Sequence, residues 1–164
     1  MQLSAPALAV LTRGFAQSPE VTQRELLSAM HEATLLVERE VKENIHTGAT
    51  GLTRASVTSD SSSTATGVLG VVGSSSPAAT FVELGTKPHM PPSQALIPWV
   101  RAVLGVDAKR APGVAFLVAR KIARVGTKAQ KPFERAITAQ EAAVVRRFEL
   151  AASKVAEHLA GSGA

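Results

Sequence analysis

Apolar side chains recur every three or four residues along two long stretches, which predicts two long amphipathic helices. The first stretch opens with Ser18-Pro19-Glu20, a helix-start pattern of N-cap serine, first-turn proline and first-turn acid. Its apolar face contains Leu26, Met30, Ala33, Val37 and Val41, so we expect a helix from residue 18 to about Ile45. The second helix is predicted from about Pro132, with the stripe Phe133, Ile137, Val144, Phe148, Val155 and Leu159.

Between these helices the chain turns to Gly, Ser and Thr, a composition that favours strands and turns. We predict strands at 52–58 and 67–73, separated by a polar loop at 59–66. Gly70 lies inside the second strand and indicates a bulge or a close backbone approach. The apolar run 78–84 is predicted as a third strand, and the short connections favour antiparallel pairing.

Helices are expected again after a proline-rich loop at 85–92. One covers 96–104, with Pro98 in its first turn and Gly105 after its end. The next starts near Ala111 and ends at Gly126, with the predicted buried stripe Phe116, Ala119, Ile122 and Ala123.

The predicted fold class is therefore α+β. A small antiparallel sheet of three or more strands packs with a long N-terminal helix and with C-terminal helices. One domain is expected over 1–164, made of an N-terminal segment at 1–17, a core at 18–160 and a frayed tail at 161–164.

Composition narrows the possible classes of protein. The 164 residues are 45% hydrophobic but only 4% aromatic, without Tyr or Cys, so disulfides and thiolate chemistry are excluded and base stacking is disfavoured. No apolar run approaches the roughly 20 residues that span a bilayer. The apolar start of the chain has no basic residue before it, so we expect a structured N-terminus, no signal peptide and no membrane partner.

The net charge of +5 is concentrated in one region. Over 109–135 a single acid, Glu134, stands against Lys109, Arg110, Arg120, Lys121, Arg124, Lys128, Lys131 and Arg135. Such a cluster fits a nucleic-acid patch. A solvated helix face followed by a basic loop is the simpler interpretation and the one favoured for a generic protein, and the pattern leaves both interpretations open.

Catalytic patterns are not found in the sequence. The four histidines lack metal-ligand spacing, and no serine lies in a nucleophile elbow. Glu83 and His89 form the one candidate acid–base pair of a hydrolase, although two ordinary turn residues explain them more simply. We therefore expect no enzyme, no metal and no cofactor.

The segment 78–86 stands out because Glu83 is the only acidic residue between Asp60 and Asp107. We predict that Val82 anchors a sheet edge, that Glu83 makes a fixed polar contact, and that Gly85 lets the chain turn away. The expected partner of Glu83 is Arg54 within the chain, or the basic segment of a neighbouring subunit.

Three stretches, in order, resemble the head–tail joining (neck or tail-completion) proteins of long-tailed bacteriophages. Residues 50–57, TGLTRASV, are similar to a Thr-Gly-x-Leu-x-x-Ser segment. Residues 79–86, ATFVELGT, are similar to a Tyr-Ala-x-x-Val-Glu-Phe-Gly-Thr signature, from which they depart by lacking Tyr and by having Leu for Phe. Trp99-Val100-Arg101, then 114–127 and Pro132-Phe133, look like the longer variant of that family, and the resemblance covers roughly 18–150.

This resemblance implies a structural, non-enzymatic virion protein at the neck, made in the host cytoplasm and assembled as a homo-oligomeric ring, with a hexamer expected. Its implied partners are copies of itself, head-connector and tail proteins, and DNA passing through the channel. Candidate interface residues are Arg54, Glu83, Gly85, Thr86, Arg120, Arg124, Lys128 and Lys131. Candidate DNA-channel residues are Lys109, Arg110 and Lys121. A basic nucleic-acid-binding protein is the alternative function.

Overall fold

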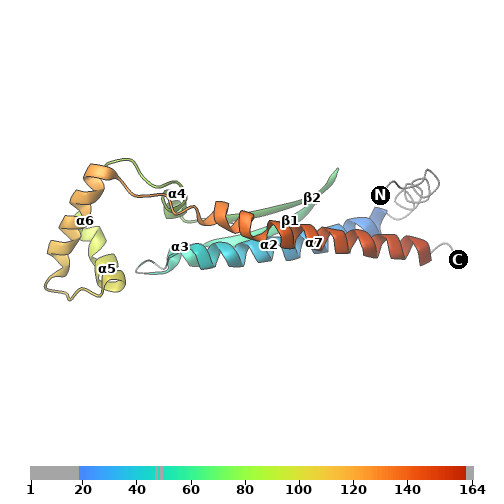
Figure 1. Ribbon diagram of the computed structural model, residues 1–164, viewed down its shortest axis with the longest axis horizontal. Helices are drawn as coiled ribbons and strands as arrows, with labels where there is room; N and C mark the ends of the chain where they lie inside the picture. The colour runs from blue at the N-terminus through green and yellow to red at the C-terminus, as the bar shows by residue number, and fades with distance from the viewer. Residues whose placement is uncertain (1–18, 47, 49, 162–164) are drawn as a thin grey trace. The chain divides into compact units, whose positions relative to one another are not determined.

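The computed structural model describes residues 19–46, 48 and 50–161, so the predicted N-terminal segment and the end of the predicted tail lie outside the described residues. The elements, labelled as in Figure 1, are α2 (Pro19–Asn44), α3 (Leu52–Ala55), β1 (Val57–Thr64), β2 (Gly67–Ser74), α4 (Pro77–Leu84), α5 (Ser93–Leu104), α6 (Ala111–Val125) and α7 (Pro132–Gly161). Within these ranges no helix is both long and apolar enough to cross a membrane.

The predicted sheet of three or more strands is wrong. Helices account for 67% of the described residues, and the sheet contains two antiparallel strands, β1 and β2. The predicted strand at 52–58 is mostly the short helix α3, and the predicted loop at 59–66 is mostly strand β1. Serine-rich sequence forms a strand here because a two-residue turn brings it against β2, and because only alternate residues of its first half face inward.

The predicted third strand at 78–84 is also wrong, because this run forms helix α4. Ser76 precedes Pro77, which occupies the first turn of the helix as Pro19 does in α2. An apolar run of this length does not by itself separate a strand from a helix. Val82 therefore lies in a helix and anchors no sheet edge.

The chain forms two compact units. The first, which we call the bundle unit, contains the described residues up to Val37 together with 59–72 and those from Ala139 onward. The second, which we call the clasp unit, contains the described residues of Glu38–Thr58 and Gly73–Thr138. The boundary cuts α2, the hairpin and α7, so each of these elements contributes to both units.

In the bundle unit, α2 and α7 lie side by side and antiparallel (Figure 1). Arg147 pairs with Glu32, and Lys154 lies 3.9 Å from Glu25, so residue numbers rise along one helix as they fall along the other. The buried residues are small or β-branched: Ala29 and Ala33 on α2, and Ala151 and Val155 on α7. Small side chains let helices approach closely, which explains why alanine takes the buried positions.

The hairpin packs on α2 through Gly70. A Cβ at this position would lie 2.4 Å from Sδ of Met30 and 2.5 Å from Cγ2 of Thr34. The predicted close approach at Gly70 is confirmed, because no larger residue fits without displacing α2 side chains.

In the clasp unit, α5 and α6 form a helical hairpin around a core of Val100, Ala111 and Ala115. The predicted ends of these helices at Gly105 and Gly126 are confirmed, while Pro98 lies inside α5 and not in its first turn. One predicted core residue is wrong, because Phe116 on α6 is exposed, and Ile137 of the predicted α7 stripe is exposed as well. Alanines occupy most of the buried positions on these helices, namely Ala111, Ala115 and Ala119 on α6 and Ala136 on α7.

Candidate functional site

Two Gly-Thr dipeptides cross at the centre of the clasp unit. Gly85-Thr86 follows α4, and Gly126-Thr127 follows α6. Each glycine closes its helix by donating its N–H to the carbonyl four residues earlier, at 2.9 Å for Gly85 to Phe81 and 2.8 Å for Gly126 to Ile122. We call these four residues, Gly85, Thr86, Gly126 and Thr127, the Gly-Thr clasp.

The two threonines of the clasp pair as an isolated antiparallel bridge. The N–H of Thr86 donates to the carbonyl of Thr127 at 3.1 Å, and the N–H of Thr127 donates to the carbonyl of Thr86 at 3.2 Å. Their hydroxyl oxygens are 3.0 Å apart. The bridge joins the ends of two helices that are about forty residues apart in the sequence.

Glycine is required at both clasp positions for two reasons. Gly85 has φ 71° and ψ −174°, and Gly126 has φ 71° and ψ −160°, a region that is open essentially to glycine only. A Cβ on Gly85 would lie 2.4 Å from the Thr127 carbonyl oxygen, and a Cβ on Gly126 would lie 1.9 Å from that of Thr86. The backbones therefore cross at a distance that no side chain permits.

Glu83 caps the N-terminus of α7. Its carboxylate accepts hydrogen bonds from the backbone N–H of Phe133 at 2.9 Å and of Glu134 at 3.2 Å. These are the second and third residues of α7, whose N–H groups have no partner within the helix. The residue before the helix, Lys131, has no acceptor in its side chain, so Glu83 supplies from fifty residues away the acceptor that an N-cap residue usually provides.

The predicted fixed polar contact of Glu83 is thus confirmed. Within the described residues Arg54 is wrong as its partner, while a contact with the basic segment of a neighbouring subunit stays a prediction. Its hydrogen bonds go to the α7 backbone, and neither Arg54 nor a basic side chain forms an ion pair with it. The backbone around it is fixed as well, since the N–H of Gln130 donates to the carbonyl of Val82 at 2.9 Å. Hydrogen bonds therefore fix the segment 82–86 against the segment that leads into α7.

Lys131 adopts a φ of 54° and pairs with Glu134 at 2.6 Å. The Glu134 carboxylate raises the pKa of Lys131 through this hydrogen bond and by charge attraction, and Glu83 adds a smaller attraction. Both residues are exposed, so this pair contributes little to stability.

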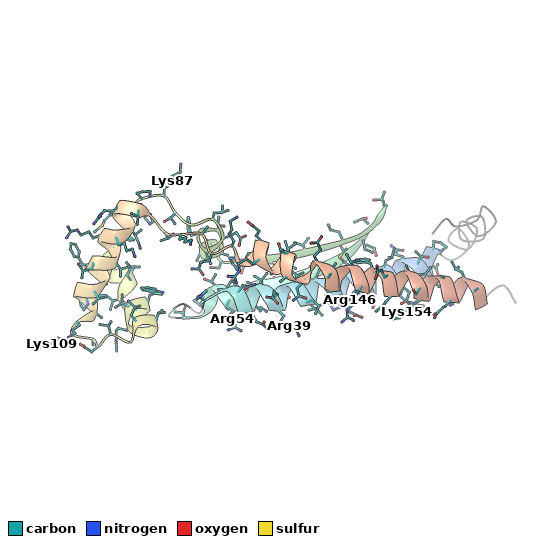
Figure 2. The ribbon with its side chains drawn as sticks, in the orientation of Figure 1. Arg39, Arg54, Lys87, Lys109, Arg146 and Lys154 are labelled. Atoms are coloured by element: carbon teal, nitrogen blue, oxygen red, sulfur yellow. The ribbon has the colours of Figure 1, made fainter. Side chains whose placement is uncertain are left out.

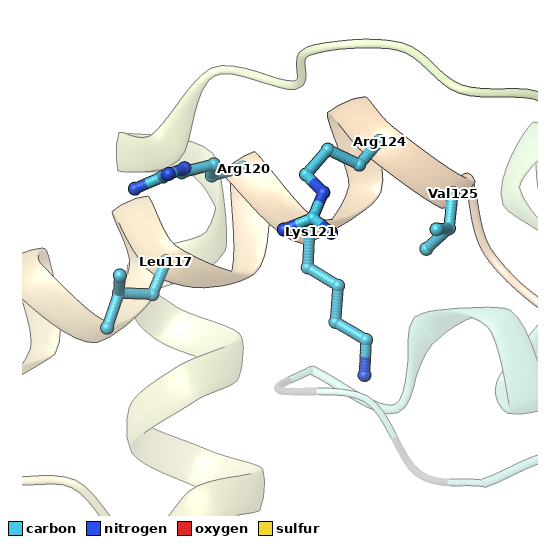
Figure 3. Close-up of a pocket in the computed structure, with 5 residues that line it drawn as sticks. All are labelled: Leu117, Arg120, Lys121, Arg124 and Val125. Atoms are coloured by element: carbon cyan, nitrogen blue, oxygen red, sulfur yellow. The ribbon is translucent and has the colours of Figure 1, made fainter.

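The predicted basic residues 120, 121 and 124 lie together on α6. With Leu117 and Val125 they line a hollow of about 530 Å³ (Figure 3). Figure 3 shows Leu117, Lys121 and Val125 on the same side of the helix. Within the described residues, no carboxylate lies within ion-pair distance of Arg120, Lys121 or Arg124.

The other predicted basic residues are dispersed over the clasp unit. Arg54 lies on α3, and Lys109 lies in the turn before α6 (Figure 2). The Asp107 carboxylate accepts backbone N–H groups of Lys109 and Arg110, both at 3.0 Å, and lies 3.7 Å from the Arg110 guanidinium. Lys128 joins Lys121 around a second hollow of about 660 Å³ between the ends of α5 and α6. Seven of the eight predicted interface residues thus lie in the clasp region or on α6, and the eighth, Arg54, lies on α3.

The geometry offers no acid–base pair at Glu83. His89 directs Nδ1 to the carbonyl of Lys87 at 2.9 Å, while both oxygens of Glu83 are directed to α7. In the part of the chain that the structure describes, no three His, Asp or Glu side chains gather as metal ligands would.

Sequence reasoning missed the clasp, although a signal for it was present. The tripeptide Gly-Thr-Lys occurs twice, at 85–87 and 126–128, each time directly after an apolar segment. Two identical helix-ending tripeptides indicate two equivalent turns, and equivalent turns are able to pair.

No protein-family model, no curated protein and no solved structure matches this chain.

Proposed function

We propose that this chain is a structural assembly protein of the neck of a tailed phage, which joins copies of itself into a ring between the head connector and the tail. The proposal is supported by residues 79–86, whose sequence resembles the family signature. In this segment Glu83, Gly85 and Thr86 all serve to hold helices together. Residues used in this way suit a scaffold that carries contacts, and both oxygens of the Glu83 carboxylate are taken up by the α7 backbone.

Exposed apolar side chains on several elements support an assembling protein. Large residues that are about half exposed or more occur on most of the described elements: Leu52, Leu69, Val71, Phe81, Leu84, Met90, Leu104, Phe116, Leu117, Val125, Ile137, Val145 and Leu150. Single exposed apolar residues are ordinary, but this number of them supports a surface that other chains cover.

The test is the native mass of the purified protein, together with electron microscopy and copurification with head-connector and tail proteins of a tailed phage. We expect closed rings, or a stable complex with at least one of these proteins. A protein that stays monomeric at high concentration and binds neither partner would refute the proposal.

Nucleic-acid binding is the second candidate, favoured by Arg120, Lys121 and Arg124 of α6, which form no ion pair with the described residues. Phosphate contacts of this kind weaken steeply with salt. Binding of duplex DNA should therefore be measured at several salt concentrations, and the absence of binding at low salt would eliminate this candidate.

A further inference from the structure

One face of α6 combines apolar and cationic side chains in a regular order. Leu117, Lys121 and Val125 are spaced four residues apart, and Arg120 and Arg124 flank them. Leu117 is 60% exposed and Val125 is 63% exposed, and both line the hollow. We call these five residues the α6 face.

The composition of the α6 face fits a protein partner better than a phosphate backbone. Burying exposed leucine and valine against a partner is favourable by about 25 cal/mol per Å² of apolar surface removed from water. Arginine beside apolar residues is typical of protein–protein interfaces, whereas nucleic-acid interfaces are more polar. The cations lack ion pairs within the described chain, so the partner should supply carboxylates around an apolar centre.

A face with these properties is found on α7. Glu141, Val145 and Glu149 are spaced four residues apart, so they lie along one side of the helix. Val145 is 50% exposed, and neither glutamate forms an ion pair within the described residues. We call these three residues the α7 face. Its two carboxylates are opposite in charge to the cations of the α6 face, and Val145 is an exposed apolar residue between them.

The charges of the two units support pairing between different copies. The clasp unit, which carries the α6 face, has thirteen Lys and Arg against six Asp and Glu. The described part of the bundle unit, which carries the α7 face, has four Lys and Arg against seven Asp and Glu. The two units therefore carry net charges of opposite sign, and charge complementarity favours contact between the clasp unit of one copy and the bundle unit of the next.

We propose that the α6 face of one copy packs against the α7 face of the next copy, head to tail. Val145 packs against an apolar residue of the α6 face, and Glu141 and Glu149 pair with its cations. Because the two faces are different, each copy keeps one face free for a further copy, which is the requirement for a ring. The contact deepens the self-assembly proposed above and rests on it.

Two charge-reversed variants test the contact. Variant one is Lys121→Glu with Arg124→Glu, and variant two is Glu141→Lys with Glu149→Lys. Each variant alone places like charges in every contact, so we expect self-association to weaken more than about tenfold. In an equimolar mixture every contact between alternating copies again joins opposite charges, and association should return. Sedimentation at matched total concentration measures all three samples, and circular dichroism verifies that each variant is folded.

The matched control is Lys109→Glu with Arg110→Glu. It changes the net charge by the same amount as variant one, but at the opposite end of α6. We expect this control to associate as the unaltered protein does. If it weakens association as strongly as variant one, net charge and not the α6 face governs assembly, and the contact is wrong.

Three further results would overturn the proposed contact. The first is that neither variant weakens self-association. The second is that the equimolar mixture stays dissociated while a single protein carrying all four reversals associates. That second result would indicate that the two faces pair within one chain. The third is a variant one that loses DNA binding but keeps self-association, which would assign the α6 face to nucleic acid. If rings form equally well with and without these substitutions, the contact is wrong but the proposed function still stands. If association returns in the mixture of the two variants but the protein forms no rings and binds no connector protein, the contact stands and the phage function is refuted.

Discussion

Replacing Glu83 with alanine removes the side-chain acceptor of two backbone N–H groups at the start of α7. The carboxylate lies 2.9 and 3.2 Å from these nitrogens, and no local N-cap side chain takes its place. Loss of an N-cap acceptor costs about 0.5–2 kcal/mol, and hydrogen bonds to a charged group lie at the upper end of their range. Glu83 is only partly buried, so water replaces part of the loss. We expect Glu83→Ala to lower the free energy of unfolding by about 2 kcal/mol.

Glu83→Gln separates charge from shape. The amide oxygen still accepts one hydrogen bond, but the negative charge that favours a helix N-terminus is lost, and the amide NH2 faces a backbone donor. We expect a loss of about 1 kcal/mol, between the unaltered protein and the alanine variant.

Urea unfolding measures both variants, followed by circular dichroism and by the fluorescence of Trp99, the single tryptophan, which lies on α5 in the clasp unit. For a chain of this size each 1 kcal/mol should lower Tm by roughly 2–4 °C. Glu157→Gln, an exposed change on α7, is the control and should leave stability unaltered. If Glu83→Ala unfolds at the same urea concentration as this control, the capping role of Glu83 is refuted.

Three further changes test other parts of the structure. Gly126→Ala should destabilise the clasp unit by more than about 4 kcal/mol in urea unfolding, because it adds a backbone clash to a forbidden conformation. The control Gly113→Ala, with open space around the added Cβ, should be neutral or stabilising. Equal effects of the two changes would contradict the clasp. Gly70→Ala should cost about 1–2 kcal/mol, since overpacking against Met30 and Thr34 exceeds the gain from replacing a strand glycine, and an unchanged melting temperature would show that the hairpin lies further from α2. The Lys131–Glu134 pair should contribute fully below pH 10.5 and be lost as pH rises through the raised pKa of Lys131, so the unaltered protein should lose slightly more stability at high pH than Glu134→Gln does; identical pH profiles would argue against the pair.

The long helices could be predicted because their signals are local. Pro19 and Pro132 occupy first helical turns, and Gly126 ends α6 where it was expected. A repeat of 3.6 residues and a terminal proline or glycine act through neighbours in sequence, so no knowledge of the fold is needed to interpret them. Which apolar residues face inward was predicted less well, because Phe116 and Ile137 are exposed while alanines fill the closely packed positions.

The central part of the chain could not be predicted in the same way. Val57–Thr64 is a strand despite its polar sequence, and Pro77–Leu84 is a helix despite resembling a strand. Short segments have weak intrinsic preference, so the partner against which they pack decides their conformation. For β1 that partner is β2, together with helix α2 at Ser61 and His31, whose side chains lie 3.4 Å apart.

From the sequence by itself follow the two long helices, the helix ends at Gly105 and Gly126, the basic cluster over 109–135, and the expectation that Glu83 makes a fixed contact. Only the tertiary structure decided what that contact is. Glu83 binds the start of α7 fifty residues away, and Gly85 meets Thr127 across the clasp. Local periodicity marks neither partner, because a backbone N–H is the same group at every position. The N–H groups at the start of α7 that lack a partner within the helix become evident only when the fold places the Glu83 carboxylate beside them.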